Sequence, residues 1–106
     1  MDKANELEEN KFIRRLKECI VDLLKDEKVR IVLFGSRAKG NANPLADVDV
    51  GLIHKGKVDR NKIARLRESV EELNIPYKVD IVDFSYVSRE FKKEALKEVE
   101  VWKDLN

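Results

Sequence analysis

A chain of 106 residues is about the size of one ordinary domain, and its 42% of hydrophobic residues are enough to build a core. Charged residues make up 41% of the chain but nearly cancel to a formal net charge of +1, which argues against non-specific nucleic-acid binding through an overall positive field. The one cysteine, Cys19, excludes an internal disulfide framework and a metal cluster built from cysteines.

The sequence starts with polar and charged residues and contains no apolar run approaching the roughly 18 residues of a membrane span. We therefore expect no signal peptide, no contact with the membrane and a soluble cytoplasmic protein. A local basic patch for nucleic acid stays open, although the lysines at 92, 93 and 97 fit a solvated helix face more simply.

Hydrophobic periodicity predicts one domain over residues 1–106, with elements in the order α-β-β-α-β-α-β. Helices are expected over residues 10–25, 59–74 and 89–97, and strands over residues 29–34, 47–54, 77–84 and 98–103. Asp59 and Ser88 are expected to cap the second and third helices. A short connection between the first two strands predicts an α/β (α+β) fold, a small mixed sheet with helices packed on one side.

Two carboxylates open the second predicted strand, at Asp47 and Asp49. Residues i and i+2 of a strand point to the same face, so these side chains are expected to lie together while Val48 and Val50 enter the core. Neighbouring like charges repel, and a hard divalent cation such as Mg²⁺ relieves that repulsion through oxygen ligands. Alone, two acids at this spacing are also typical of a solvated strand edge.

A Gly-Ser turn follows the first buried strand at Gly35 and Ser36. Glycine permits a sharp turn and the close approach of a ligand. If Ser36 begins a short helix, its free N–H groups and hydroxyl form an anion site, to which Arg37 and Lys39 add positive charge suited to polyphosphate. The turn and the two acids together predict a site for a metal–triphosphate complex.

A third acid, Asp80, lies within the third predicted strand, between Val79 and Ile81. A carboxylate among apolar neighbours is costly to bury unless it is paired or binds a ligand. If this strand lies beside that of Asp47, Asp80 completes a cluster of three carboxylates able to hold two cations. Asp83 points to the other face and is interpreted as a strand-end or capping residue.

Three carboxylates and a phosphate cradle are typical of two-metal displacement at phosphorus. One Mg²⁺ would activate an attacking hydroxyl, and the other would hold the triphosphate and its departing pyrophosphate. Asp80 is the candidate general base or second ligand at the hydroxyl.

The motif resembles a known signature. Gly35 and Ser36 are followed by ten residues and then by Asp-Val-Asp at 47–49, as in the polymerase-β-like nucleotidyltransferase superfamily. Residues 34–42 read Phe-Gly-Ser-Arg-Ala-Lys-Gly-Asn-Ala, and residues 46–50 read Ala-Asp-Val-Asp-Val. These segments are similar to the minimal nucleotidyltransferases, many of which act as antitoxins of HEPN-domain toxins, and the resemblance spans nearly the whole chain.

The resemblance implies transfer of a nucleoside monophosphate, usually AMP from ATP, to a hydroxyl, which in the antitoxin branch is a tyrosine of the HEPN toxin. Gly35, Ser36 and Arg37 would bind the nucleotide phosphates or, for Arg37, the acceptor. The catalytic metal ligands would be Asp47, Asp49 and Asp80. The family commonly has Ser before its first catalytic Asp, whereas this chain has Ala46, which loses one hydrogen bond to the loop.

Other functions are also compatible with the sequence. The chain could neutralise a partner by contact alone, although contact would not require three acids, or it could transfer a nucleotide to a small molecule or nucleic acid. The only histidine, His54, is interpreted as a surface strand-end residue, with a metal or base role as the alternative. Trp102 and Tyr86 could belong to the core or to a partner-binding patch. A domain of this size has no separate module to present an acceptor, so a HEPN-domain protein or a second copy would supply it.

Overall fold

The computed structural model describes residues 3–40, 43 and 45–105, with side chains described from residue 11 onward. Its elements in chain order are α1 (Lys3–Leu23), β1 (Val29–Phe34), β2 (Val48–His54), α2 (Arg60–Glu72), β3 (Val79–Asp83), the 3-10 helix η1 (Phe84–Tyr86), α3 (Arg89–Ala95) and β4 (Glu100–Lys103). The predicted order of helices and strands is therefore confirmed. Residues 41, 42 and 44, which belong to the predicted motif loop, lie outside the described residues.

Both predicted helix caps are confirmed. The side chain of Asp59 accepts a hydrogen bond from the backbone N–H of Asn61, and Ser88 accepts one from the N–H of Phe91. These bonds satisfy amide groups that the first helical turn leaves without a partner. The first helix begins earlier than its apolar pattern predicts, at Lys3 instead of residue 10.

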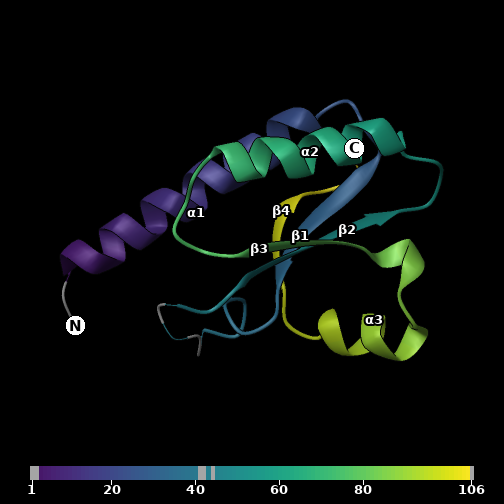
Figure 1. Ribbon diagram of the computed structural model, residues 1–106. Helices are drawn as coiled ribbons and strands as arrows, with labels where there is room; N and C mark the ends of the chain where they lie inside the picture. Colours follow the sequence, from purple (N-terminus) through teal and green to yellow (C-terminus); the bar gives the residue numbers. More distant parts are fainter. Residues whose placement is uncertain (1–2, 41–42, 44, 106) are drawn as a thin grey trace.

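The strands form a mixed four-stranded sheet in the order β3-β2-β1-β4 (Figure 1). Strand β1 runs antiparallel to both β2 and β4, whereas β2 and β3 are parallel. A parallel pair needs a crossover connection, and α2 supplies it between β2 and β3. The predicted small mixed sheet is confirmed, and its one parallel pair brings two distant segments side by side.

The main core lies between the sheet and the helices α1 and α2, which cover one face (Figure 1). Leu16 and Ile20 of α1 and Leu66 of α2 are fully buried there, together with Val48 and Val50 of β2. The predicted inward orientation of Val48 and Val50 is thus confirmed. None of the helices in the described part of the chain is both long and apolar enough to cross a bilayer.

A smaller aromatic cluster covers part of the opposite face. The ring of Phe34 in β1 lies 5.2 Å from that of Phe84 and 6.1 Å from that of Phe91 in α3, centroid to centroid. Helix α3 therefore lies on the other side of the sheet from α1 and α2, as Figure 1 shows. The expectation that all helices pack on one side was wrong, because the aromatic residues of β1, η1 and α3 form a core of their own.

Candidate active site

Two of the three predicted carboxylates, Asp49 and Asp80, lie side by side at the amino ends of the two parallel strands. Asp49 is the second residue of β2 and Asp80 the second residue of β3, and the two are partners in the parallel register. Residues paired in this way project from the same face of the sheet. That face is the one opposite α1 and α2, because the neighbouring Val48 and Val50 point into the main core. The predicted neighbourhood of Asp49 and Asp80 is therefore present.

The surroundings of the three acids differ from what the sequence indicates. Asp80 is exposed, although its apolar neighbours in sequence suggested a buried carboxylate. Those neighbours alternate with Asp80 across the sheet, so that Ile81 enters the core while Asp80 faces solvent. Asp47 is also exposed and precedes β2 instead of opening it, and Asp49 is half-buried. Asp49 is therefore the inner member of the group.

The pKa of Asp49 is affected by the other two acids. Burial raises the pKa of its carboxyl group, and the negative charges of Asp80 and then Asp47 raise it further, while Lys78 acts in the opposite direction. A bound cation would offset this repulsion and lower the pKa of Asp49 again, so the position is suited to a cation. The three side chains therefore concentrate negative charge at one edge of the open face.

Gly35 brings the motif loop directly against Asp49. Phe34, the last residue of β1, pairs with Asp49 in the antiparallel register, so the chain leaves β1 beside that carboxylate. A Cβ atom built on Gly35 would lie 2.3 Å from the Asp49 Oδ2, and the φ of Gly35 is +79°. Both the contact and the left-handed backbone require glycine here.

The segment after Gly35 forms turns and not a short helix beginning at Ser36. The N–H of Lys39 donates to the carbonyl of Gly35 at 3.3 Å, and that of Gly40 donates to the carbonyl of Arg37 at 3.3 Å. Ser36 is exposed at the start of these turns. Ser36 thus follows directly on Gly35, the residue that lies against Asp49, and it is open to solvent.

Arg37 has a role that the sequence did not reveal. Its Nε and Nη2 groups both donate to the carbonyl oxygen of Ala46, at 3.1 and 2.8 Å, and its guanidinium lies 4.3 Å from the ring centroid of Tyr77. The side chain therefore ties the first turn of the loop to the residue just before Asp47. No local sequence signal indicates this bond, because it depends on how the loop closes.

The donor chemistry of Asp47, Asp49 and Asp80 fits Mg²⁺, which prefers a few carboxylate oxygens and completes its shell with water and phosphate. Within the described residues, no three potential ligand side chains are gathered closely enough to hold a metal by themselves. An ion bound here would therefore rely on oxygen atoms from water or a nucleotide as well as on the carboxylates.

His54 differs most from its prediction. It ends β2 as expected, but its side chain is only 10% exposed, and its Nε2 lies 3.0 Å from the Asp83 Oδ1. Asp83 also accepts a hydrogen bond from the N–H of Ser85 and caps η1, which confirms it as a capping residue. The interpretation of His54 as a surface residue was wrong, because the parallel register brings Asp83 beside it. Trp102 is buried and belongs to the core, whereas Tyr86 is exposed.

Comparisons with known proteins agree with the motif. Residues 18–104 match the family model described as polymerase beta, nucleotidyltransferase. A curated relative from Haemophilus influenzae, named probable protein adenylyltransferase MntA, is 35% identical over 60 residues, which are 57% of this chain and 53% of the relative. The chain thus spans about half the length of that relative.

Solved structures share the fold. A candidate minimal nucleotidyltransferase is 25% identical with a TM-score of 0.66, covering 83% of this chain and 90% of its own. A toxin–antitoxin structure with AMP-PNP is 23% identical with a TM-score of 0.63, covering 83% and 73%. A complex of a tri-AMPylated Shewanella oneidensis HEPN toxin with an MNT antitoxin is 20% identical with a TM-score of 0.59, covering 86% and 71%.

Proposed function

This chain belongs to the polymerase beta nucleotidyltransferase family, and we propose on that basis that it transfers AMP from ATP to a hydroxyl group of a protein partner. The hydroxyl oxygen attacks the α-phosphorus of ATP, a new P–O bond forms, and the bond to pyrophosphate breaks. The predicted class of enzyme, a nucleotidyltransferase, is confirmed at the level of the family. The nucleotide, the acceptor and the metal are parts of the proposal.

One observation supports the proposal above the others: Asp49 and Asp80 are direct partners across the parallel strands, and Gly35 lies against the Asp49 carboxylate. A turn without a side chain next to an acid pair would let a phosphate chain approach the backbone beside negative oxygen ligands. A protein that acted by contact alone would gain nothing from this concentration of like charge, which costs free energy in the absence of a cation.

In this proposal, Asp47, Asp49 and Asp80 would hold two Mg²⁺ ions, with the remaining oxygen ligands coming from the phosphates of ATP. Bound there, Mg²⁺ lowers the pKa of the attacking hydroxyl and offsets the charge of the departing pyrophosphate. The exposure of Asp80 supports a role at the acceptor hydroxyl, whose proton it would take. Gly35 lets the phosphates approach the backbone, and Ser36 donates its hydroxyl to them.

The proposed acceptor is a tyrosine hydroxyl of a HEPN-domain toxin, and the chain acts as its antitoxin. Two structures of similar fold support this, since one is a toxin–antitoxin pair with AMP-PNP and the other contains a HEPN toxin that is AMPylated. The exposure of Asp80 suits a substrate brought by another protein.

The test incubates a purified HEPN-domain protein with the full chain, Mg²⁺ and ATP labelled on the α-phosphate. We expect label on a tyrosine of the partner with the native chain and at least 100-fold less with Asp49→Asn. A matched control is Asp26→Asn, which removes an exposed acid from a loop far from the motif. If neither the native chain nor Asp49→Asn labels the partner, yet both inhibit it equally, the chain acts by contact and the proposal fails.

A further inference from the structure

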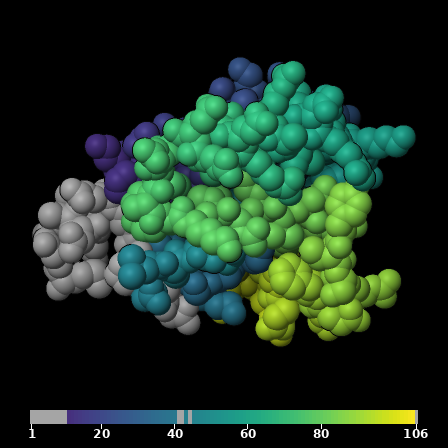
Figure 2. All heavy atoms as spheres, in the orientation of Figure 1, coloured from purple at the N-terminus to yellow at the C-terminus, as the bar shows by residue number. Residues whose placement is uncertain are grey.

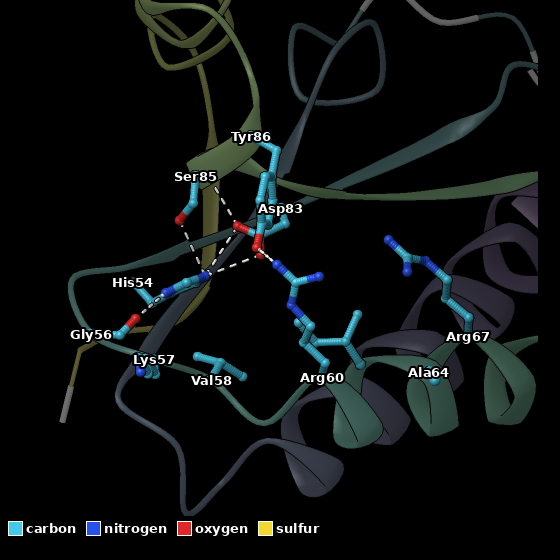
Figure 3. A pocket seen from close by; sticks show the side chains of 11 residues that line it. His54, Gly56, Lys57, Val58, Arg60, Ala64, Arg67, Asp83, Ser85 and Tyr86 are labelled. Carbon is cyan, nitrogen blue, oxygen red and sulfur yellow. Dashed lines mark hydrogen bonds and ion pairs between the residues drawn. The ribbon is translucent and has the colours of Figure 1, made fainter.

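A second cavity lies at the other end of the parallel strands. It has a volume of about 690 Å³ and lies between the carboxyl ends of β2 and β3 and the first turns of α2 (Figure 3). This volume is within the range of about 300–1,000 Å³ that is usual for small-molecule sites. In open sheets with parallel strands, ligands commonly bind outside the carboxyl ends of the strands.

The cavity is separate from the candidate active site. His54 and Asp83, which line it, project toward the face covered by α2, whereas Asp49 and Asp80 project from the opposite face. His54 and Asp49 are also five residues apart along β2, which corresponds to about 16 Å. A ligand in this cavity therefore cannot be the nucleotide held by the three acids.

Positive charge predominates around the cavity. Lys57, Arg60 and Arg67 line it, and none of the three forms an ion pair with a carboxylate of the described residues. Arg60 donates to the Tyr86 hydroxyl, and Arg67 donates to the carbonyl of Ile81 at 3.1 Å. Each guanidinium has five N–H donors, so most of them remain for a ligand. Figure 3 shows both arginine side chains rising from α2 into the same space.

The one carboxylate in the lining is already engaged. The Nε2 of His54 lies 3.0 and 3.1 Å from the two oxygens of Asp83, and its Nδ1 lies 2.6 Å from the carbonyl of Gly56. Oxygen acceptors at both ring nitrogens favour the doubly protonated imidazolium, which then neutralises Asp83. The three basic side chains are thus left as an uncompensated positive group.

Most of the remaining lining is apolar. Val58, Ile63 and Ala64 form one side, and the exposed ring of Tyr86 borders the other. A ligand that fills this cavity would combine a strongly anionic group with an apolar or aromatic part. Arginine pairs with phosphate through two parallel hydrogen bonds, and a phosphate monoester carries up to two negative charges, whereas a carboxylate carries one.

We propose that this cavity binds a small organic phosphate, with its phosphate held by Arg60 and Arg67 and its apolar part against Val58 and Ile63. Site and ligand are independent of the proposed nucleotidyl transfer, because they lie on the other face of the sheet and use none of the three acids. The spacing of seven residues places both arginines on one side of α2, two turns or about 10.5 Å apart, so their long side chains would have to converge to hold one phosphate.

The experiment titrates the full chain with phenyl phosphate by isothermal calorimetry, without Mg²⁺ so that the acid cluster does not take up the anion. We expect saturable binding, a Kd at least tenfold higher for Arg60→Gln and for Arg67→Gln, and less than a twofold change for Arg65→Gln. Arg65 is the matched control, since it is an exposed arginine of the same helix that does not line the cavity. Asp49→Asn should also bind as the native chain does.

Further probes separate the parts of the ligand. Inorganic phosphate should bind at least tenfold more weakly than phenyl phosphate, and phenol should not saturate. Equal losses of affinity in Arg65→Gln and Arg67→Gln would show that binding depends only on overall charge. Loss of binding in Asp49→Asn would place the bound phenyl phosphate at the active site. Tighter binding of a hexaglutamate peptide than of phenyl phosphate would make the cavity a protein-docking surface. Each of these three results, like the absence of saturation, overturns the proposal.

Discussion

Asp49 and Asp80 lie directly opposite each other in the parallel register of β2 and β3, on the face of the sheet that α1 and α2 leave open. Their carboxylates repel each other in the absence of a cation, and this repulsion contributes to the raised pKa of Asp49. In the space-filling view, the blue-to-teal segment that leads into β2 lies next to the green segment of β3 at the surface (Figure 2).

Asp80→Asn should separate stability from ligand binding. The substitution removes a repulsive charge from an exposed position, so the free energy of unfolding of the metal-free chain should change by less than about 0.5 kcal/mol. The increase in Tm produced by Mg²⁺ with AMP-PNP should disappear. Differential scanning fluorimetry with and without the ligands measures both, and Asp26→Asn should keep the ligand-induced increase. A full ligand-induced increase in Asp80→Asn would remove this residue from the site.

Gly35→Ala and Gly40→Ala form a matched pair. Both glycines have positive φ, +79° and +76°, so alanine should cost about 1–2 kcal/mol of backbone strain at either position. Only at Gly35 would the new methyl group meet the Asp49 carboxylate, because nothing lies within 4 Å at Gly40. We expect Gly35→Ala to lose more stability than Gly40→Ala in urea unfolding, because it adds this clash to the same backbone strain, and we expect at least tenfold weaker binding of AMP-PNP for Gly35→Ala alone. Equal binding by the two variants would mean that the Gly35 contact is irrelevant to the site.

Arg37→Lys should loosen the motif loop. Lysine cannot make the two-pronged contact with the Ala46 carbonyl, nor can it stack a flat cation on Tyr77. We expect a KM for ATP about tenfold higher, with a smaller change in kcat. The control is Arg30→Lys, which breaks a comparable two-pronged contact with Asp104 away from the motif. A loss of kcat at unchanged KM would instead assign Arg37 to the transition state.

His54→Gln should destabilise the protein in a pH-dependent manner. Burial lowers the pKa of His54, but its hydrogen bonds with Asp83 and the Gly56 carbonyl and the Asp83 charge raise it overall, above its usual 6.5. Burial alone would raise the pKa of Asp83, yet its hydrogen bonds with Ser85 and His54 and the His54 charge hold it below 3.8. The raised pKa holds although Lys57, Arg60 and Arg67 line the same cavity.

The sign of the effect follows from these two shifts. The stabilising contribution of His54 is complete below pH 6.5 and is lost as the pH rises through its folded pKa, whereas that of Asp83 is complete above pH 3.8 and is lost as the pH falls. The native chain should therefore exceed His54→Gln by roughly 1–3 kcal/mol near about pH 5.5, and by less at about pH 9. Urea unfolding at both values measures the difference. A gap that widens with increasing pH would show that the histidine is neutral in the native state.

The sequence carries most of the information about the elements. Residues 29–34 combine β-branched and apolar side chains, and the strand that they predict is observed with the same bounds. The Asp59 and Ser88 caps were also evident, because each depends only on residues two or three positions away. The start of α1 at Lys3 could not be located from the apolar pattern, since the first turns of the helix carry no apolar stripe.

Contacts across the sheet were harder to predict. The pairing of His54 with Asp83 joins residues 29 positions apart and exists only because β2 and β3 are parallel in one register. The exposure of Asp80 follows from the same register, which decides which face of β3 is covered. Arg37 and Ala46 meet through the closure of an irregular loop. Periodicity specifies each element, whereas these contacts depend on how elements pair.

The position of β4 at the edge of β1 affects how a cell can make this protein. Val32 and Leu33 pair with Val101 and Glu100, close to 70 positions later in the chain. During synthesis on the ribosome, one edge of β1 therefore stays without a partner until nearly all of the described residues have emerged. An apolar strand with free backbone groups invites pairing with other chains. Ribosome-bound chains that stop before Glu100 should consequently require a chaperone, and released ones should aggregate instead of folding.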